Sequence, residues 1–95
     1  MKTYLLMRRD LHMRRGKEIA QACHAVIGLG LMDAPTITLK CDSLPRLNQA
    51  VVRARAHGWP CHVVADAGHT EIEPGTVTCA AIRAPEGVFM DFDLY

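Results

Sequence analysis

The chain has 95 residues, of which 49% are hydrophobic and 22% are charged, and its formal net charge at pH 7 is +1. Such a chain can bury one modest core, so we expect a single globular domain over residues 1–95. Its longest apolar run, Ala25–Met32, is too short to cross a bilayer, and its first residues lack the pattern of a signal peptide. We therefore expect a cytoplasmic protein that does not enter a membrane.

Basic residues gather in the first half of the chain. Residues 1–47 carry eight Lys and Arg against four acids, whereas residues 48–95 carry three against six. Five of the basic residues fall between Arg8 and Lys17. This cluster suits contact with a polyanion, although on charge alone a solvated loop is the better interpretation.

The cysteines give no sign of a metal site. None belongs to a C-x-x-C pair, and each lies within or beside an apolar segment: Cys23, Cys41, Cys61 and Cys79. This pattern predicts buried, reduced thiols that act as small hydrophobic residues.

The first half of the chain predicts two strands, each followed by a helix. The apolar run Thr3–Met7 indicates a buried strand, and a basic loop separates it from a helix over residues 14–31. After a break at a proline, Thr36–Cys41 alternates and is rich in β-branched residues, as in a strand. Asp42 or Ser43 suits the N-cap of a second helix, which should end near Ala56.

The second half predicts further strands. Cys61–Ala65 and Thr76–Arg83 indicate a third and a fourth strand, and residues 88–94 alternate in a way that predicts a hairpin strand extending the sheet. The order strand–helix–strand–helix–strand predicts an α/β sandwich with a mixed sheet, in which the first three strands are parallel. The short connection to the fourth strand either reverses the chain or crosses over.

Two segments that are distant in the sequence are expected to meet in this fold. Sites in such sheets gather at the carboxyl ends of parallel strands, where the basic loop and residues 66–78 (DAGHTEIEPGTVT) both begin. On the first helix, one stripe should face solvent or a ligand and holds Lys17, Gln21, His24 and Gly28. The opposite stripe should pack on the sheet and holds Ile19, Ala22, Cys23 and Val26.

Three histidines and an aspartate can be grouped as potential metal ligands: His24, His62, His69 and Asp66. Their spacing fixes no coordination geometry, so no metal site is predicted.

Three motifs together resemble those of type 2 peptidyl-tRNA hydrolases. DAGHTEIEPGTVTCAAI resembles the family signature D-A-G-x-T-x-I-x-P-G-T-x-T, and DLHMRRGKEIAQACHA resembles D-L-x-M-x-x-G-K-x-A-A-Q-x-x-H-A. LKCDS, before the second helix, matches a third element. The resemblance covers residues 4–83, and it implies a three-layer α/β/α sandwich with a four-stranded mixed sheet.

The resemblance also implies an activity and a set of site residues. Members of the family hydrolyse the ester that joins a peptide to the 3′ ribose of tRNA, without a metal or an organic cofactor. The functional Lys and Asp of the family fall on Lys17 and Asp66, and its two Thr fall on Thr70 and Thr76. Gln21 and His24 match further helix positions of the family.

Ester hydrolysis requires an activated water, a stabilised oxyanion and a proton for the leaving hydroxyl. We hypothesise that Asp66 orients or deprotonates water beside Lys17, and that Thr70 or Thr76 donates to the oxyanion. His24 is expected to bind substrate or relay a proton. The basic loop, with Arg14 and Arg15, would hold tRNA phosphates. His69 is also expected to contact the substrate, but it stands where the family often has Arg, which should weaken its contact with an anion at neutral pH.

The sequence departs from the family at two places. Only Leu31–Pro35 joins the first helix to the second strand, where the family usually has an additional helical segment, and the last helix of the family is absent. A homodimer is one way to cover a face exposed by this shortening. The first alternative function is a non-catalytic module that binds tRNA or a protein partner through the same fold. A second is a hydrolase for a different small ester or amide.

Overall fold

The computed structural model describes residues 1–68 and 72–95. In chain order its elements are β1 (Lys2–Arg8), α1 (Arg15–Leu29), β2 (Thr36–Cys41), α2 (Leu44–Ala56), β3 (Cys61–Ala65) and β4 (Val77–Ala84). All six main elements predicted from the sequence are therefore present, with ends that differ by at most two residues. Ser43 is the N-cap of α2, and its side chain accepts a hydrogen bond from the Arg46 amide.

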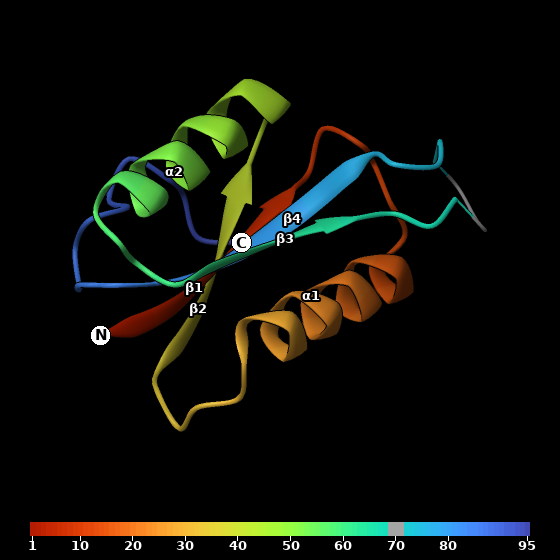
Figure 1. The fold of residues 1–95 in the computed structure, drawn as a ribbon. Helices are drawn as coiled ribbons and strands as arrows, with labels where there is room; N and C mark the ends of the chain where they lie inside the picture. The colour runs from red at the N-terminus through yellow and green to blue at the C-terminus, as the bar shows by residue number, and fades with distance from the viewer. Residues whose placement is uncertain (69–71) are drawn as a thin grey trace.

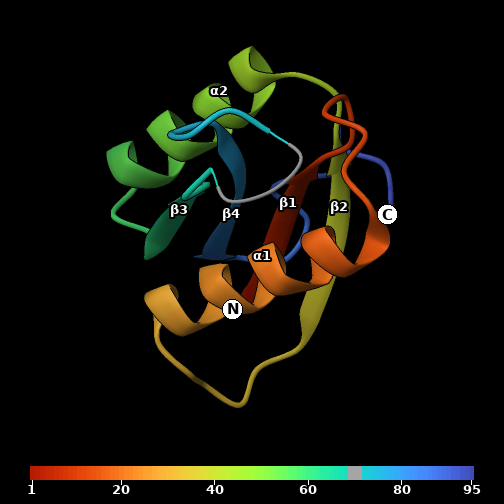
Figure 2. The same ribbon diagram turned by 90° about the vertical axis from the view of Figure 1, so that its right-hand side faces the viewer.

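The strands form one mixed sheet in the order β2-β1-β4-β3. β1 pairs with β2 in parallel, whereas β4 is antiparallel to both of its neighbours, β1 and β3. The chain therefore reverses between β3 and β4, which decides the alternative that the sequence left open. The helices lie on opposite faces of the sheet and give the three-layer α/β/α arrangement seen in Figures 1 and 2.

Each face of the sheet has its own hydrophobic core. The larger core lies beneath α2 and includes Leu6, Leu47, Ile82, Phe89 and Phe92. The smaller core lies beneath α1 and is built mainly from short or flexible side chains, among them Leu5, Met7, Ala25, Val64 and Cys79. The α1 face is therefore less completely filled with large apolar residues, and polar side chains share it.

The orientation of α1 differs from the prediction. The helix buries Glu18, Gln21 and Ala25 against the sheet, whereas Ile19 is 59% exposed and Cys23 is also exposed. The predicted sheet-facing stripe is thus wrong for Ile19 and Cys23, although Ala22 and Val26 do pack at the edge of the core. The other stripe, predicted to face solvent or a ligand, lines a groove with all four of its residues, although Gln21 is buried there: Lys17, Gln21, His24 and Gly28. The physical reason is that polar groups of the sheet require hydrogen-bond partners, and a buried Gln supplies them.

The C-terminal segment is not the predicted hairpin strand. Residues 86–91 form turns, and only Leu94 makes an isolated antiparallel bridge, to Leu39 at the edge of β2. A strand would place Phe89 and Phe92 on opposite faces, whereas the turn lets both enter the core beneath α2. Their rings meet edge to face at 6.0 Å between centroids.

The cysteines are free, and three of the four follow the prediction at least in part. Cys41 and Cys79 are buried, Cys61 is half-buried, and Cys23 is exposed, contrary to expectation. Burial raises the pKa of the Cys79 thiol to about 11, so this thiol is protonated at neutral pH. Within the described ranges 1–68 and 72–95, neither helix is long and apolar enough to span a bilayer.

Candidate active site

Lys17 and Asp66 are 49 positions apart in the sequence and meet at one end of the sheet. Lys17 lies in the first turn of α1, and Asp66 directly follows β3. The Lys17 Nζ is 2.5 Å from the Asp66 Oδ1, and the side chains are only 13% and 2% exposed. Their separation from water strengthens the electrostatic attraction between them. The predicted pair is therefore in contact.

A second group of polar side chains holds Asp66 from the side of the sheet. The Gln21 Nε2 donates to the Asp66 Oδ1 at 3.2 Å, and the Thr78 Oγ1 donates to the Gln21 Oε1 at 3.0 Å. The other oxygen, Asp66 Oδ2, accepts from the Gly68 amide at 2.6 Å. The ammonium group of Lys17, the side-chain amide of Gln21 and the backbone amide of Gly68 thus fix the orientation of this carboxylate.

A β-bulge explains why Thr78 reaches α1. Val64 pairs with Cys79 and Ala65 pairs with Val77, so β4 has one residue, Thr78, without a partner in the register. The extra residue changes the direction of its side chain relative to simple alternation. Thr78 is fully buried and bonds Gln21, which the sequence pattern alone did not indicate.

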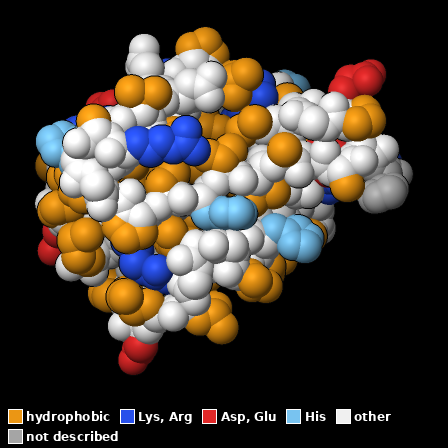
Figure 3. Space-filling model, in the orientation of Figure 1, with side chains coloured by type: hydrophobic (Ala, Val, Ile, Leu, Met, Phe, Trp, Pro, Cys, Tyr) orange, Lys and Arg blue, Asp and Glu red, His pale blue; other side chains and the backbone are white. Residues whose placement is uncertain are grey.

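An open groove of about 750 Å³ lies between α1 and β3 and ends at the Lys17–Asp66 pair. One wall comes from α1 and includes Ala20, His24 and Ile27, while the other follows residues 62–67. Figure 3 shows histidine side chains close together on this face of the molecule, among apolar and backbone atoms. The groove is large enough for several residues of an extended chain or for a nucleotide.

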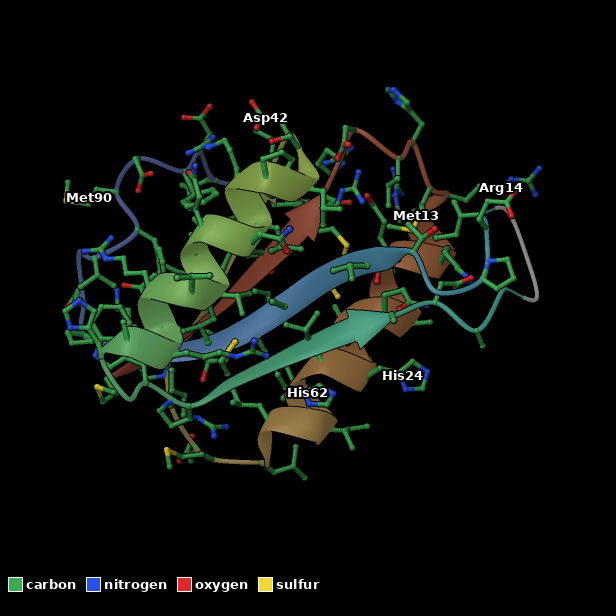
Figure 4. The ribbon with its side chains drawn as sticks, turned by 45° about the horizontal axis from the view of Figure 1, so that its top comes forward. Met13, Arg14, His24, Asp42, His62 and Met90 are labelled. Atoms are coloured by element: carbon green, nitrogen blue, oxygen red, sulfur yellow. The ribbon has the colours of Figure 1, made fainter. Side chains whose placement is uncertain are left out.

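His62 forms part of the groove and was not predicted as a site residue. Its ring lies so close to Gly28 that a Cβ added there would be 2.2 Å from the imidazole. Figure 4 shows His62 between β3 and α1, whereas His24 projects outward from α1. Strand periodicity was a usable signal, because His62, Val64 and Asp66 alternate onto the face that α1 covers.

The basic residues near α1 divide into two kinds. Arg8 is buried and internally bonded: it contacts Asp10 at 2.7 Å and donates to the Val77 carbonyl at 3.0 Å. Arg14 and Arg15 are exposed at the start of the helix. The cluster predicted from the sequence therefore presents Arg14 and Arg15 to solvent, while Arg8 anchors the loop to β4.

Tyr95 also contacts the first turn of α1, through Glu18. The Tyr95 hydroxyl donates to the Glu18 Oε1, and Glu18 Oε2 lies 3.2 Å from the Arg9 Nε. The Arg9 guanidinium also lies 4.3 Å from the centre of the Tyr95 ring. The hydrogen bond to Glu18, followed by burial, raises the pKa of the Tyr95 hydroxyl.

The loop after β3 is described only in part. His69 and Thr70 lie outside the described residues, so their predicted contributions stay predictions. Thr76 is half-buried, and its carbonyl accepts from the Asp66 amide at 2.8 Å. This backbone hydrogen bond joins the last residue of the loop, Thr76, to its first residue, Asp66.

The described part of the chain contains no group of three or more His, Cys, Asp or Glu side chains arranged to hold a metal ion. His24, His62 and Asp66 all line the groove, but they do not form such a group. The fourth potential ligand, His69, is among the residues that the structure does not describe.

Comparison with known proteins gives one consistent family. The family model described as peptidyl-tRNA hydrolase PTH2 matches residues 1–33 and 30–91, in two pieces that meet at the connection between α1 and β2. The chain is 38% identical over 99 residues to a peptidyl-tRNA hydrolase of Metallosphaera sedula, covering 86% of this chain and 85% of that protein.

Two further relatives, from other archaea, carry the same name. A peptidyl-tRNA hydrolase of Haloquadratum walsbyi is 41% identical over 95 residues, which cover 86% of this chain and 84% of that protein. One of Methanocaldococcus jannaschii is 36% identical over 98 residues, with coverage of 86% and 84%.

Proposed function

This chain belongs to the peptidyl-tRNA hydrolase PTH2 family, and from that premise we propose that it hydrolyses the ester bond of peptidyl-tRNA. The products are free tRNA and a peptide. The observation that supports this best is the shielded Lys17–Asp66 pair, 2.5 Å apart, at the end of an open groove. A binding module has no need of a carboxylate held by three kinds of donor beside a groove.

Asp66 is the residue that activates water in this proposal. Its carboxylate orients a water molecule or takes its proton, and the water oxygen attacks the ester carbonyl carbon. The bond from that carbon to the ribose oxygen then breaks, and the ribose oxygen takes up the proton that the water gave up, so that it leaves as a hydroxyl. Lys17 stabilises the negative charge that develops, while it also holds Asp66 in place.

The remaining site residues bind substrate or stabilise charge. Thr70 or Thr76 donates a hydrogen bond to the oxyanion, and His24 contacts the substrate in the groove or relays a proton. Gln21 positions Asp66 through its side-chain amide. His69 contacts the substrate on the loop side.

Arg14 and Arg15 bind tRNA phosphates at the start of α1. Both are exposed, and the positive end of the helix dipole at an N-terminus also favours anions. Affinity for tRNA should therefore fall about tenfold or more between 50 mM and 200 mM salt, since each neutralised phosphate releases counterions. Filter binding of deacylated tRNA at several salt concentrations measures this slope, and a flat response would contradict the assignment.

The central experiment compares wild type and Asp66→Asn on N-acetylaminoacyl-tRNA. Loss of the carboxylate should lower kcat/KM by about 10²–10⁴, the range typical of a general base. Asp33→Asn is the matched control, because Asp33 is an exposed acid in the connection between α1 and β2. Equal activity of wild type and Asp66→Asn would favour the alternative, a module that binds tRNA or a protein without catalysis.

Two further proposals concern the setting of this activity. We propose that residues 1–95 act as one domain in translation, in the cytoplasm. We also propose a homodimer, in which a second copy covers apolar side chains that α1 and the connection after it expose: Ile19, Ile27, Leu31 and Met32.

A further inference from the structure

The outer edge of β3 offers backbone groups for hydrogen bonding. β3 is the last strand in the sheet order, and β4 is its pairing partner among the described residues. The Pro60 carbonyl accepts from the Arg83 amide, so the backbone groups of residue 60 face β4. The amide and carbonyl of Asp66 also face β4, since they bond residues 76 and 75.

The directions of the backbone groups at residue 60 and at Asp66 determine the directions of the backbone amides and carbonyls between them. In an antiparallel pair, residues whose backbone groups face the partner alternate with residues whose groups face away. Residues 60, 62, 64 and 66 face β4, so the amides and carbonyls of Cys61, Val63 and Ala65 point away from the sheet. Cys61 and Val63 are half-buried and Ala65 is exposed, which leaves this edge accessible.

The groove beside α1 follows this same edge. Six consecutive residues, 62–67, line it, although alternate side chains of a strand point to opposite faces. Val63 packs toward the core beneath α2 and Val64 toward the core beneath α1. A surface that touches both must reach the backbone edge between them, which Figure 1 shows facing the viewer.

We propose that the β3 edge binds the peptide part of peptidyl-tRNA as an added strand, an inference that rests on the proposed function. The ester must lie at the Lys17–Asp66 end of the groove, which is the carboxyl end of β3. The esterified residue is the C-terminal residue of the peptide. The peptide therefore runs parallel to β3, with its N-terminal part toward Cys61.

Backbone pairing suits this substrate because a peptide released from translation can have any sequence. Main-chain hydrogen bonds give affinity that does not depend on side chains. β3 has five residues, which span about 13 Å and can pair with about four residues of an extended peptide. His62 and Ile27 line the groove beside this path and leave it open on one side.

The first test uses wild-type enzyme and tRNA acylated with N-acetylated peptides of one to six residues. The value of kcat/KM should rise about tenfold between one and four residues, as backbone hydrogen bonds are added, and then stay constant. A value independent of length would overturn the proposal. Absence of hydrolysis even for the N-acetylaminoacyl substrate would instead overturn the proposed function, so the two failures are distinguishable.

The second test removes single amide donors from a four-residue peptide by N-methylation. Only alternate amides of an added strand face β3, so methylation should lower kcat/KM several-fold at every second residue and leave it unchanged between them. Methylation at the sixth residue of a longer peptide is the control and should have no effect. An equal effect at all four positions would contradict strand addition.

A protein variant probes the same edge from the other side. Val63→Pro removes one outward amide, which an edge strand tolerates, and circular dichroism verifies that the variant folds. The variant should lose most of the gain that four-residue peptides show over the N-acetylaminoacyl substrate. If Val63→Pro instead converts a dimer to a monomer and the N-methylation pattern is flat, a second copy occupies the edge and the proposal is wrong.

Discussion

Gln21 connects the carboxylate of Asp66 to the interior of the sheet. Its amide nitrogen donates to Asp66, and its oxygen accepts from Thr78, which is fully buried. This places a polar side chain where a simple amphipathic helix would have an apolar one. The orientation of α1 and the geometry of the candidate active site therefore depend on the same residue.

Replacing Gln21 by Ala should affect the chemical step more than substrate binding. Asp66 would lose one of its donors, so we expect kcat to fall about tenfold with a small change in KM. Stability should fall by about 1–2 kcal/mol, because Thr78 loses a buried partner. Gln49→Ala, at an exposed position of α2, is the matched control for both quantities.

Steady-state kinetics on N-acetylaminoacyl-tRNA and denaturant unfolding measure these two effects separately. A Gln21→Ala enzyme that loses stability but keeps its kcat would show that Gln21 only supports the fold. If Gln21 had a purely structural role, wild type and Gln21→Ala would also have the same kcat/KM under conditions where the variant is folded.

At the scale of elements, the strands were predictable because their local pattern and their burial agree. Thr36–Cys41 and Cys61–Ala65 were predicted with the ends that the structure has. The contacting face of α1 was not predictable from apolar periodicity, since Glu18 and Gln21 are buried while Ile19 is exposed. Where polar residues bond an active-site carboxylate or a residue of a β-bulge, polar side chains are buried and apolar ones exposed. Nothing in the neighbouring sequence distinguishes such residues.

The prediction of a hairpin strand in the C-terminal segment was wrong for a different reason. Residues 88–94 alternate between apolar and polar positions, but Phe89 and Phe92 are three residues apart and both fill the core beneath α2. Arg53 and Arg46 of α2 bond the carbonyls of Val88 and Asp91, which holds the turn in place. These are long-range contacts. The convergence of Lys17 with Asp66 is also long-range, and there the topology and the family resemblance supplied the missing information.

The C-terminal residue should stabilise the start of α1 in a pH-dependent manner. Tyr95→Phe removes the donor to Glu18 and should lower the free energy of unfolding by about 1 kcal/mol at pH 7–9, since Tyr95 is partly exposed. The pKa of Tyr95 is raised in the folded protein, mainly by the bond to Glu18. Its contribution is therefore complete below the ordinary tyrosine pKa of about 10 and disappears as the pH rises through the higher folded value.

Denaturant unfolding of wild type and Tyr95→Phe at pH 7, 9 and 11 measures this difference. The two proteins should differ by the full amount at pH 7 and 9 and by less at pH 11, because the contribution begins to be lost above the ordinary tyrosine pKa. A difference that persists unchanged at pH 11 would show that the ring contact with Arg9, and not the hydroxyl, carries the contribution.

At the scale of the whole molecule, the short connection after α1 exposes large apolar side chains on the surface. The family match is split there, at residues 30–33, and the structure leaves Leu31 82% and Met32 61% exposed. Leu31 and Ile27 border an apolar hollow above Leu5 and Ala22. Large apolar side chains that gather in one place usually mark an interface in a protein that stays in solution.

If a second copy covers this surface, a charge placed there should separate the copies. Leu31→Glu should convert wild-type dimers into monomers of about 10.5 kDa, because burying an unpaired carboxylate costs more than the lost contact. Val52→Glu is the matched control, since Val52 is 65% exposed on the opposite face, on α2, and should leave the mass unchanged. Light scattering coupled to size-exclusion chromatography measures all three proteins. A monomeric wild type would contradict the homodimer, whereas dissociation by Val52→Glu alone would place the interface on α2.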